Sequence, residues 1–271
     1  MNEIPSYDIG KIHLKNYNNE TKKIILSNLK NYIKLKIFYC SINNLIKLPD
    51  LPNSLTHLYC DNNNLKELPD LPNSLEYLEC SSNNLIELPR LPNSLTYLRC
   101  INNNLKELPN LPNSLKFLIC KYNNLIKLPD LPNLLEYLGC HYNELIKLPN
   151  LPNSLTRLMC YNNNLTELSD LPKSLIHLYC NNNKLTELPD LPNSLTYLNC
   201  KFNNLTYHNL EIKTINKTNL KNKIIKRMKV LNRTLLLEHS AMITMNPKRI
   251  KRLLYNLEID FFDGSFDSLT H

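Results

Sequence analysis

The sequence predicts an α/β solenoid, with a parallel sheet on the concave side, helix-free segments on the convex side and helical caps at both ends. Two observations predict it. All nine cysteines fall at intervals of twenty residues, from Cys40 to Cys200. Around each, the chain repeats L-x-x-L-x-C-x-x-N-x-L and then, with few exceptions, x-x-L-P-x-L-P-N-S. A fixed period of this length indicates stacked coils, because one coil alone cannot bury its apolar side.

The strand of each copy lies around its cysteine. In the copy of residues 91–110, apolar residues alternate with variable ones, so Leu98 and Cys100 should point inward while Tyr97 and Arg99 point outward. Stacking such strands produces a parallel sheet. The pattern and its period are the signature of leucine-rich repeats, at the short end of their range of about 20–29 residues.

The other constant letters predict the turn and the return path. An asparagine follows each cysteine by three residues, and its amide can satisfy backbone groups where the chain leaves the strand. Most copies carry two prolines, which fix φ and lack an N–H. They favour an extended, polyproline-like convex side over a helix.

Three segments follow from the extent of the pattern. Residues 35–206 hold the nine copies, and residues 1–34 are expected to form an N-terminal cap. Residues 19–34 are expected to form its helix, because four apolar residues stand there at helical spacing: Ile24, Ile25, Leu29 and Ile33. Residues 207–271 are expected to form a basic helical C-terminal cap or tail, with an amphipathic series of Leu220, Ile224, Met228, Leu231 and Leu235.

Charge and cysteine content limit the function classes. The net charge of +8 divides into +3 for residues 1–34, −2 for residues 35–200 and +7 for residues 201–271. We find neither the apolar core of a signal peptide nor about 18 consecutive apolar residues, so we expect a cytoplasmic protein without a membrane span. One cysteine per coil forms a line rather than a tetrahedron, so we expect buried free thiols, no metal and no cofactor.

The variable positions on the strands are the candidate partner-binding residues. They combine aromatic, charged and apolar side chains, the types enriched where proteins contact each other. The candidates are Tyr77, Glu79, Tyr97, Arg99, Phe117, Ile119, Lys121, Tyr122, Tyr137, His141, Tyr142, Arg157, Met159 and Tyr161. The alternative is that the aromatic column of Tyr77, Tyr97, Phe117 and Tyr137 stabilises the sheet by stacking. No grouping of nucleophile, base and oxyanion donor indicates an enzyme.

The basic C-terminal helices offer a second alternative. Their lysines and arginines could contact nucleic acid or an anionic surface, although the sequence contains no recognised nucleic-acid-binding motif. A charge run of this kind is more often a solvated helix face. Protein binding on the concave sheet therefore remains the favoured prediction.

Residues 35–205, with their doubled L-P-x-L-P, resemble the twenty-residue repeats of secreted Yersinia and Shigella effectors. The core cysteine and the asparagine-rich turns, as in LPNSLTYLRCINNNLKE, are more similar to leucine-rich repeat proteins of giant DNA viruses of amoebae, and so is the segment NPKRIKRLLYNLEIDFFDGSFDSL. The resemblance implies a non-enzymatic scaffold with a host or viral protein partner, in the host cytoplasm if viral.

Ubiquitin ligation is the remaining function that the resemblance raises. Some Shigella-type effectors carry a C-terminal ubiquitin ligase domain with a catalytic cysteine, but residues 201–271 contain no cysteine, so that activity is not transferred. Residues 1–34 are short for an F-box. A substrate-recognition subunit of a ubiquitin ligase complex stays as an alternative.

Overall fold

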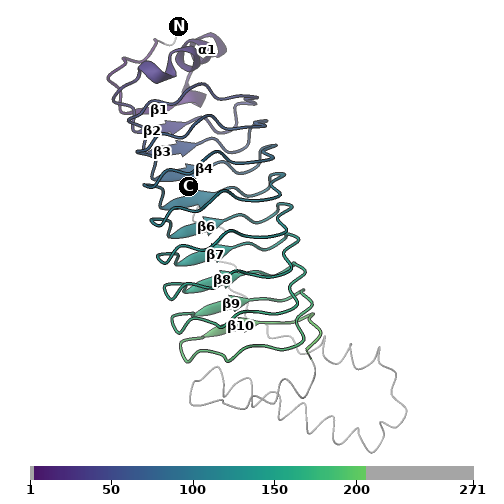
Figure 1. Cartoon of the computed structure of the whole chain (residues 1–271). Helices are drawn as coiled ribbons and strands as arrows, with labels where there is room; N and C mark the ends of the chain where they lie inside the picture. Colours follow the sequence, from purple (N-terminus) through teal and green to yellow (C-terminus); the bar gives the residue numbers. More distant parts are fainter. Residues whose placement is uncertain (1–2, 206–271) are drawn as a thin grey trace, which may run out of the picture. The chain divides into compact units, whose positions relative to one another are not determined.

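The computed structural model describes residues 3–205, which form a ten-stranded parallel sheet in chain order (Figure 1). The solenoid prediction is confirmed. The strands are β1 (Lys11–His13), β2 (Ile37–Tyr39), β3 (His57–Tyr59), β4 (Tyr77–Glu79), β5 (Tyr97–Arg99), β6 (Phe117–Ile119), β7 (Tyr137–Gly139), β8 (Arg157–Met159), β9 (His177–Tyr179) and β10 (Tyr197–Asn199). Between β2 and β10, the described chain contains no helix.

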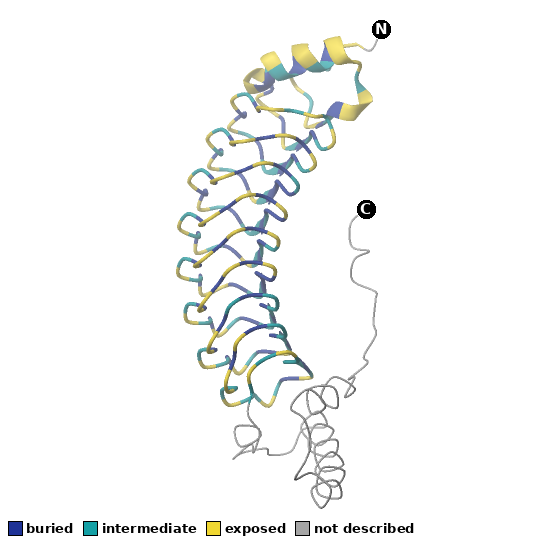
Figure 2. Cartoon of the chain, turned by 90° about the vertical axis from the view of Figure 1, so that its right-hand side faces the viewer, coloured by how far each residue is buried: buried dark blue, intermediate teal, exposed yellow. Residues whose placement is uncertain are grey.

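The register of the sheet turns each repeat position into a straight column. Tyr77 pairs with Tyr97, Leu78 with Leu98 and Glu79 with Arg99, and the same offset of twenty holds from β2 to β10. In Figure 2 the strands lie along the inner side of the curved repeat array. The side chains that point away from the core therefore line the concave face.

The core consists of the constant apolar positions. In the copy of residues 91–110, Leu95, Leu98, Cys100 and Leu105 are fully buried, and the same positions are buried in most other copies. Burying one leucine side chain contributes about 1.5–3 kcal/mol. All nine cysteines are free and eight are buried, and burial raises the pKa of the Cys120 thiol to about 12. The thiols therefore serve as packing groups.

The asparagine ladder connects neighbouring coils. The Asn123 amide nitrogen donates to the carbonyl oxygens of Cys100 (2.9 Å), Cys120 (3.1 Å) and Lys121 (3.3 Å). Its oxygen accepts from the Leu105 N–H at 3.1 Å. One side chain thus satisfies backbone groups of two coils, as the sequence predicts for this position.

Every copy contains one residue with a left-handed backbone conformation, which the sequence analysis did not predict. The second residue after each cysteine has a φ between 51° and 57°, in the left-handed region. Asparagine tolerates this conformation better than other residues with a side chain, and it occupies the position in four copies. The nine residues are Ile42, Asn62, Ser82, Asn102, Tyr122, Tyr142, Asn162, Asn182 and Phe202.

The N-terminal helix is shorter than its apolar pattern suggests. Helix α1 (Asn19–Ser27) begins at Asn18, whose side chain accepts from the Thr21 N–H at 2.9 Å. It ends at Asn28, whose amide donates to the Ile24 carbonyl at 2.9 Å. Because the chain then turns into the short 3-10 helix Leu29–Asn31, the α-helical spacing does not extend to Ile33. Ile25 and Leu29 are buried as predicted, whereas Ile24 and Ile33 are exposed.

Strand β1 is a tenth strand that the twenty-residue pattern did not reveal. It pairs with β2, with Ile12 opposite Phe38, and is followed by the 3-10 helix Leu14–Asn16. Ile12 and Leu14 are buried at the positions that the central leucine and the cysteine occupy in the copies. The predicted C-terminal helices lie outside the described residues.

Candidate partner-binding face

Strands β4 to β8 and the residues that follow them bring the fourteen predicted site residues onto five neighbouring coils. Twelve of them are at least partly exposed, but Glu79 and His141 are buried, with 7% and 2% of their surface exposed. The expectation of an exposed side chain is wrong for these two. Neighbouring side chains cover both residues: the Tyr161 ring stacks on His141 at 4.2 Å, and the Glu79 carboxylate pairs with Arg99 and accepts from the Ser81 N–H.

Aromatic rings form a ladder over the N-terminal half of the sheet. Tyr39 and Tyr59 stack with centroids 4.4 Å apart, and Tyr77 and Tyr97 stack at 4.3 Å. The two pairs are linked by Tyr59 and Tyr77, whose tilted rings are 4.9 Å apart. The faces of these rings therefore cover each other. The sequence left open the alternative that the aromatic column stabilises the sheet by stacking. Tyr77 and Tyr97 do stack in this way.

Tyr137 occupies space that Gly139 leaves open. A Cβ at Gly139 would lie 3.2 Å from the Tyr137 ring carbon Cε1. The Tyr137 hydroxyl donates to the Met159 sulfur at 2.9 Å, and the Arg157 guanidinium lies 5.8 Å from the ring centroid. Burial raises the pKa of Tyr137, although the nearby Arg157 cation opposes this. The centre of the face is thus a packed group of aromatic, thioether and cationic side chains.

Glu79 and Arg99 form an ion pair on neighbouring strands. The Arg99 Nε lies 3.3 Å from a Glu79 carboxylate oxygen, and the other oxygen accepts from the Ser81 N–H at 3.1 Å. Burial raises the pKa of Glu79, while the bond to Ser81 and the Arg99 charge counteract that rise. Glu79 therefore positions Arg99 and does not itself offer a contact surface.

Two tyrosines at the end of the strands form an exposed patch, which we call the tyrosine edge: Tyr122 and Tyr142. Their rings stack at 4.3 Å, and 45% and 40% of their surfaces are exposed. Both residues have left-handed φ, 55° and 54°. A bulky residue in this conformation is strained by about 1 kcal/mol or more. The tyrosine edge therefore holds two large exposed rings at a conformational cost.

The tyrosine edge lies over a buried histidine. The His141 ring stacks on Tyr161 at 4.2 Å and makes a tilted contact of 5.8 Å with Tyr142. Burial, with a smaller effect of the Lys121 charge, lowers the pKa of His141 to about 3. A neutral imidazole thus supports the exposed rings, and the Lys121 ammonium lies 5.8 Å from the Tyr122 ring centroid.

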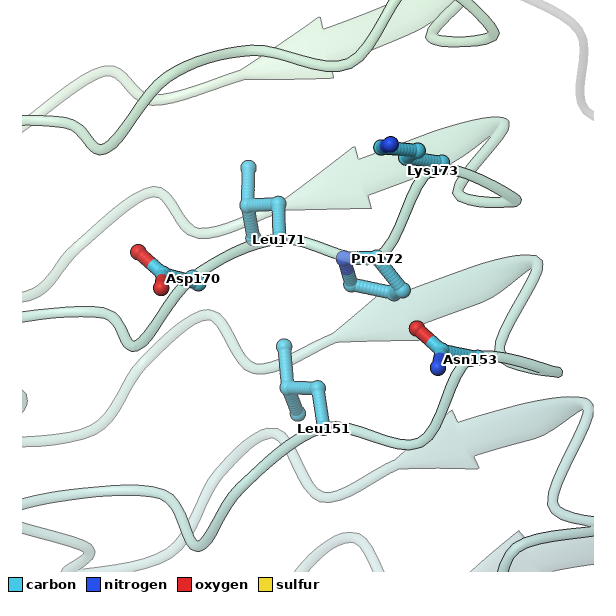
Figure 3. Close-up of a pocket in the computed structure, with 6 residues that line it drawn as sticks. All are labelled: Leu151, Asn153, Asp170, Leu171, Pro172 and Lys173. Carbon is cyan, nitrogen blue, oxygen red and sulfur yellow. The ribbon is translucent and has the colours of Figure 1, made fainter.

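One hollow of about 460 Å³ lies between two return segments (Figure 3). It is lined by Leu151, Asn153, Asp170, Leu171, Pro172 and Lys173. Its carboxylate and ammonium groups are on exposed residues of one turn, so they lack the buried convergent groups of a catalytic centre. Within residues 3–205, no cluster of three His, Cys, Asp or Glu could hold a metal, and no helix there is long and apolar enough to cross a membrane.

The repeat geometry matches solved structures of bacterial effectors. The chain shares 32% identity with a Shigella effector leucine-rich repeat domain, over 70% of this chain and 80% of that one, with a TM-score of 0.55. The chain belongs to the leucine-rich repeat proteins. YopM from Yersinia pestis is 42% identical over 62% of this chain and 55% of YopM, with a TM-score of 0.55. YopM from Yersinia enterocolitica is 33% identical over 64% and 47%, with a TM-score of 0.51.

This leucine-rich repeat protein spans about half the length of the two YopM chains. No protein-family model and no curated protein matches its sequence. The likeness covers the scaffold, so function has to be argued from the side chains of the concave face.

Proposed function

We propose that this leucine-rich repeat protein is a non-enzymatic scaffold that binds a protein partner on its concave face, with the tyrosine edge at the centre of contact. The observation that carries the proposal is the exposure of Tyr122 and Tyr142 at strained backbone positions. Exposed tyrosine is typical of residues that dominate protein interfaces. Solenoids of this kind use their concave surface for binding.

The ring geometry supports a protein over single-stranded nucleic acid on this face. Bases bind proteins by stacking on exposed aromatic faces. In the pairs Tyr77–Tyr97 and Tyr122–Tyr142, each ring covers a face of the other at 4.3 Å. The exposed part of Tyr122 and Tyr142, a ring with a hydroxyl group, suits the mixed apolar and hydrogen-bonding surface of a protein.

The finer parts of the function follow from the sequence resemblance. The partner would be a host or viral protein, and the site of action the cytoplasm, which for a viral protein is that of the host. Nucleic-acid binding by the segment 207–271 and a role in a ubiquitin ligase complex remain the alternatives. Both stay predictions, because the described residues do not include that segment and show no partner.

The test removes the tyrosine edge with residues that the scaffold already accepts. Asparagine holds the same left-handed position at Asn102 and Asn162, so we expect Tyr122→Asn with Tyr142→Asn to fold normally. This variant is better than alanine at Tyr97 and Tyr137, whose rings pack against the sheet. Quantitative capture from an amoeba lysate should lose at least one protein more than fivefold relative to the unmodified chain.

The matched control changes exposed apolar residues elsewhere. Ile46 and Ile86 are exposed at a position that holds threonine at residues 166 and 186, so Ile46→Thr with Ile86→Thr removes apolar surface outside the concave face. The control should retain the captured protein. Equal capture by the unmodified chain and the tyrosine-edge variant would contradict the proposal and direct attention to residues 207–271.

A further inference from the structure

We propose that the partner presents an acidic segment, with carboxylates beside aliphatic or aromatic side chains, to the central strands. This inference rests on the proposed function and specifies the chemistry of the partner. It comes from the charges on three columns: the two outward residues of each strand and the residue after each cysteine. We call these the strand columns.

Accessible negative charge is scarce on the strand columns. Of the fifteen acidic residues between positions 35 and 200, only Asp61 and Glu79 stand on them. Glu79 is buried against Arg99. Asp61 lies near the N-terminal end of the array, where its carboxylate is hydrogen-bonded to Ser41 and Asn62.

The cations of the strand columns gather at the centre. From β4 to β8 they are Arg99, Lys121 and Arg157, three cations against the single buried carboxylate of Glu79. The residues 35–200 as a whole carry −2, so the concave centre is positive while the rest of the repeat surface is negative. Complementary charge steers and selects partners at such surfaces.

Apolar groups lie between these cations. Phe117 and Ile119 stand on β6, and Tyr137 and Met159 contact each other beside Arg157. Glu76 and Glu136 precede their strands, at the sheet edge opposite Lys121. A partner that places carboxylates near Lys121 and Arg157, and apolar side chains between them, therefore satisfies both features.

The probe for the test is a phage-displayed library of random dodecapeptides, selected on the immobilised full chain at about pH 8. We expect the enriched peptides to place Asp or Glu next to aliphatic or aromatic residues. The charge variant is Lys121→Asn with Arg157→His, residues that the same columns carry at Asn181 and His177. Affinity for the enriched peptides should fall about fivefold for each cation removed.

The control variant has the same net charge. Lys66→Thr with Lys106→Thr removes two cations outside the strand columns, at a position that holds Thr166 and Thr186 in other copies. It should leave peptide affinity unchanged. Enrichment of neutral or basic peptides, or equal losses in both variants, would overturn the inference.

Two further outcomes separate this inference from the proposed function. Enriched peptides that bind the tyrosine-edge variant as tightly as the unmodified chain, yet bind the charge variant more weakly, would reject the tyrosine edge as the centre of contact and leave the acidic segment in place. Binding of oligo(dT) that is itself lost in the charge variant would assign the cations to phosphate recognition, and the acidic protein segment would be rejected.

Discussion

Acidification should destabilise this protein through His141, a single buried imidazole. Its pKa is lowered from the ordinary 6.5 to about 3, chiefly because burial disfavours the charged ring. The unfolded chain binds a proton below about pH 6.5, whereas the folded chain does so only near pH 3. The stability that the neutral ring contributes is therefore complete above pH 6.5 and is lost as the pH falls from 6.5 towards 3.

The expected loss at pH 5 is about 2 kcal/mol, since each pH unit below 6.5 removes about 1.36 kcal/mol. The comparison is with His141→Asn, because asparagine holds the equivalent position two coils further along, at Asn181. Urea unfolding followed by circular dichroism at about pH 8 and pH 5 gives both free energies of unfolding. His13 and His177, whose pKa values are also lowered by burial, remain in both proteins and cancel in the difference.

The variant should therefore lose about 2 kcal/mol less than the unmodified chain between these two pH values. An identical pH dependence in the two proteins would refute the reasoning. It would mean that His141 takes up its proton in the folded state, either because solvent reaches the ring or because the stack on Tyr161 opens easily.

Three other perturbations test the scaffold. Asn123→Ala should cost about 3 kcal/mol in urea unfolding, because its bonds to its own coil and to the preceding coil are lost; a cost below about 1 kcal/mol would contradict the ladder. Gly139→Ala should cost about 1–2 kcal/mol, because the new methyl group meets the Tyr137 ring at 3.2 Å; unchanged stability would show that the ring moves freely. Under native conditions iodoacetamide should label Cys200 first, since the other eight thiols are buried; mass spectrometry that finds Cys120 labelled equally fast would rule this out.

The repeat scaffold could be predicted almost completely from sequence because its constant residues perform constant tasks. The inward positions of Leu98 and Cys100 follow from alternation on a strand, and both are fully buried. The role of the asparagine follows from the donors and acceptors of its amide, and Asn123 uses both. Twenty-residue periodicity then fixes the register of the whole sheet from one copy.

Strand β1 escaped prediction because it lacks the letters of the pattern. Its segment Lys11–His13 has isoleucine where the copies have leucine, and Leu14 stands where they have cysteine. The alternation of Ile12 and Leu14 was the available signal. The shorter α1 likewise depended on a local event, the capping of the Ile24 carbonyl by Asn28, which apolar spacing does not reveal.

The candidate site was less predictable than the scaffold because burial depends on contacts between coils. His141 and Lys121 hold equivalent positions, yet the histidine is buried and the lysine is half-buried. Glu79 is buried because Arg99 and Ser81 lie within reach of its carboxylate. Such outcomes depend on which side chains happen to be neighbours, and the column position alone does not determine them.

The left-handed position after each cysteine links the scaffold to the proposed function. The turn needs this conformation in every copy, and asparagine meets the need at residues such as Asn102 and Asn162. Tyr122 and Tyr142 add strain there, and 45% and 40% of their surfaces stay exposed. Their stacking recovers only part of that cost, about 0.5–1.5 kcal/mol for an aromatic pair. A partner that covers both rings would supply the burial that the isolated fold does not. We therefore place the contact at the tyrosine edge and not at the better-packed ladder of Tyr77 and Tyr97.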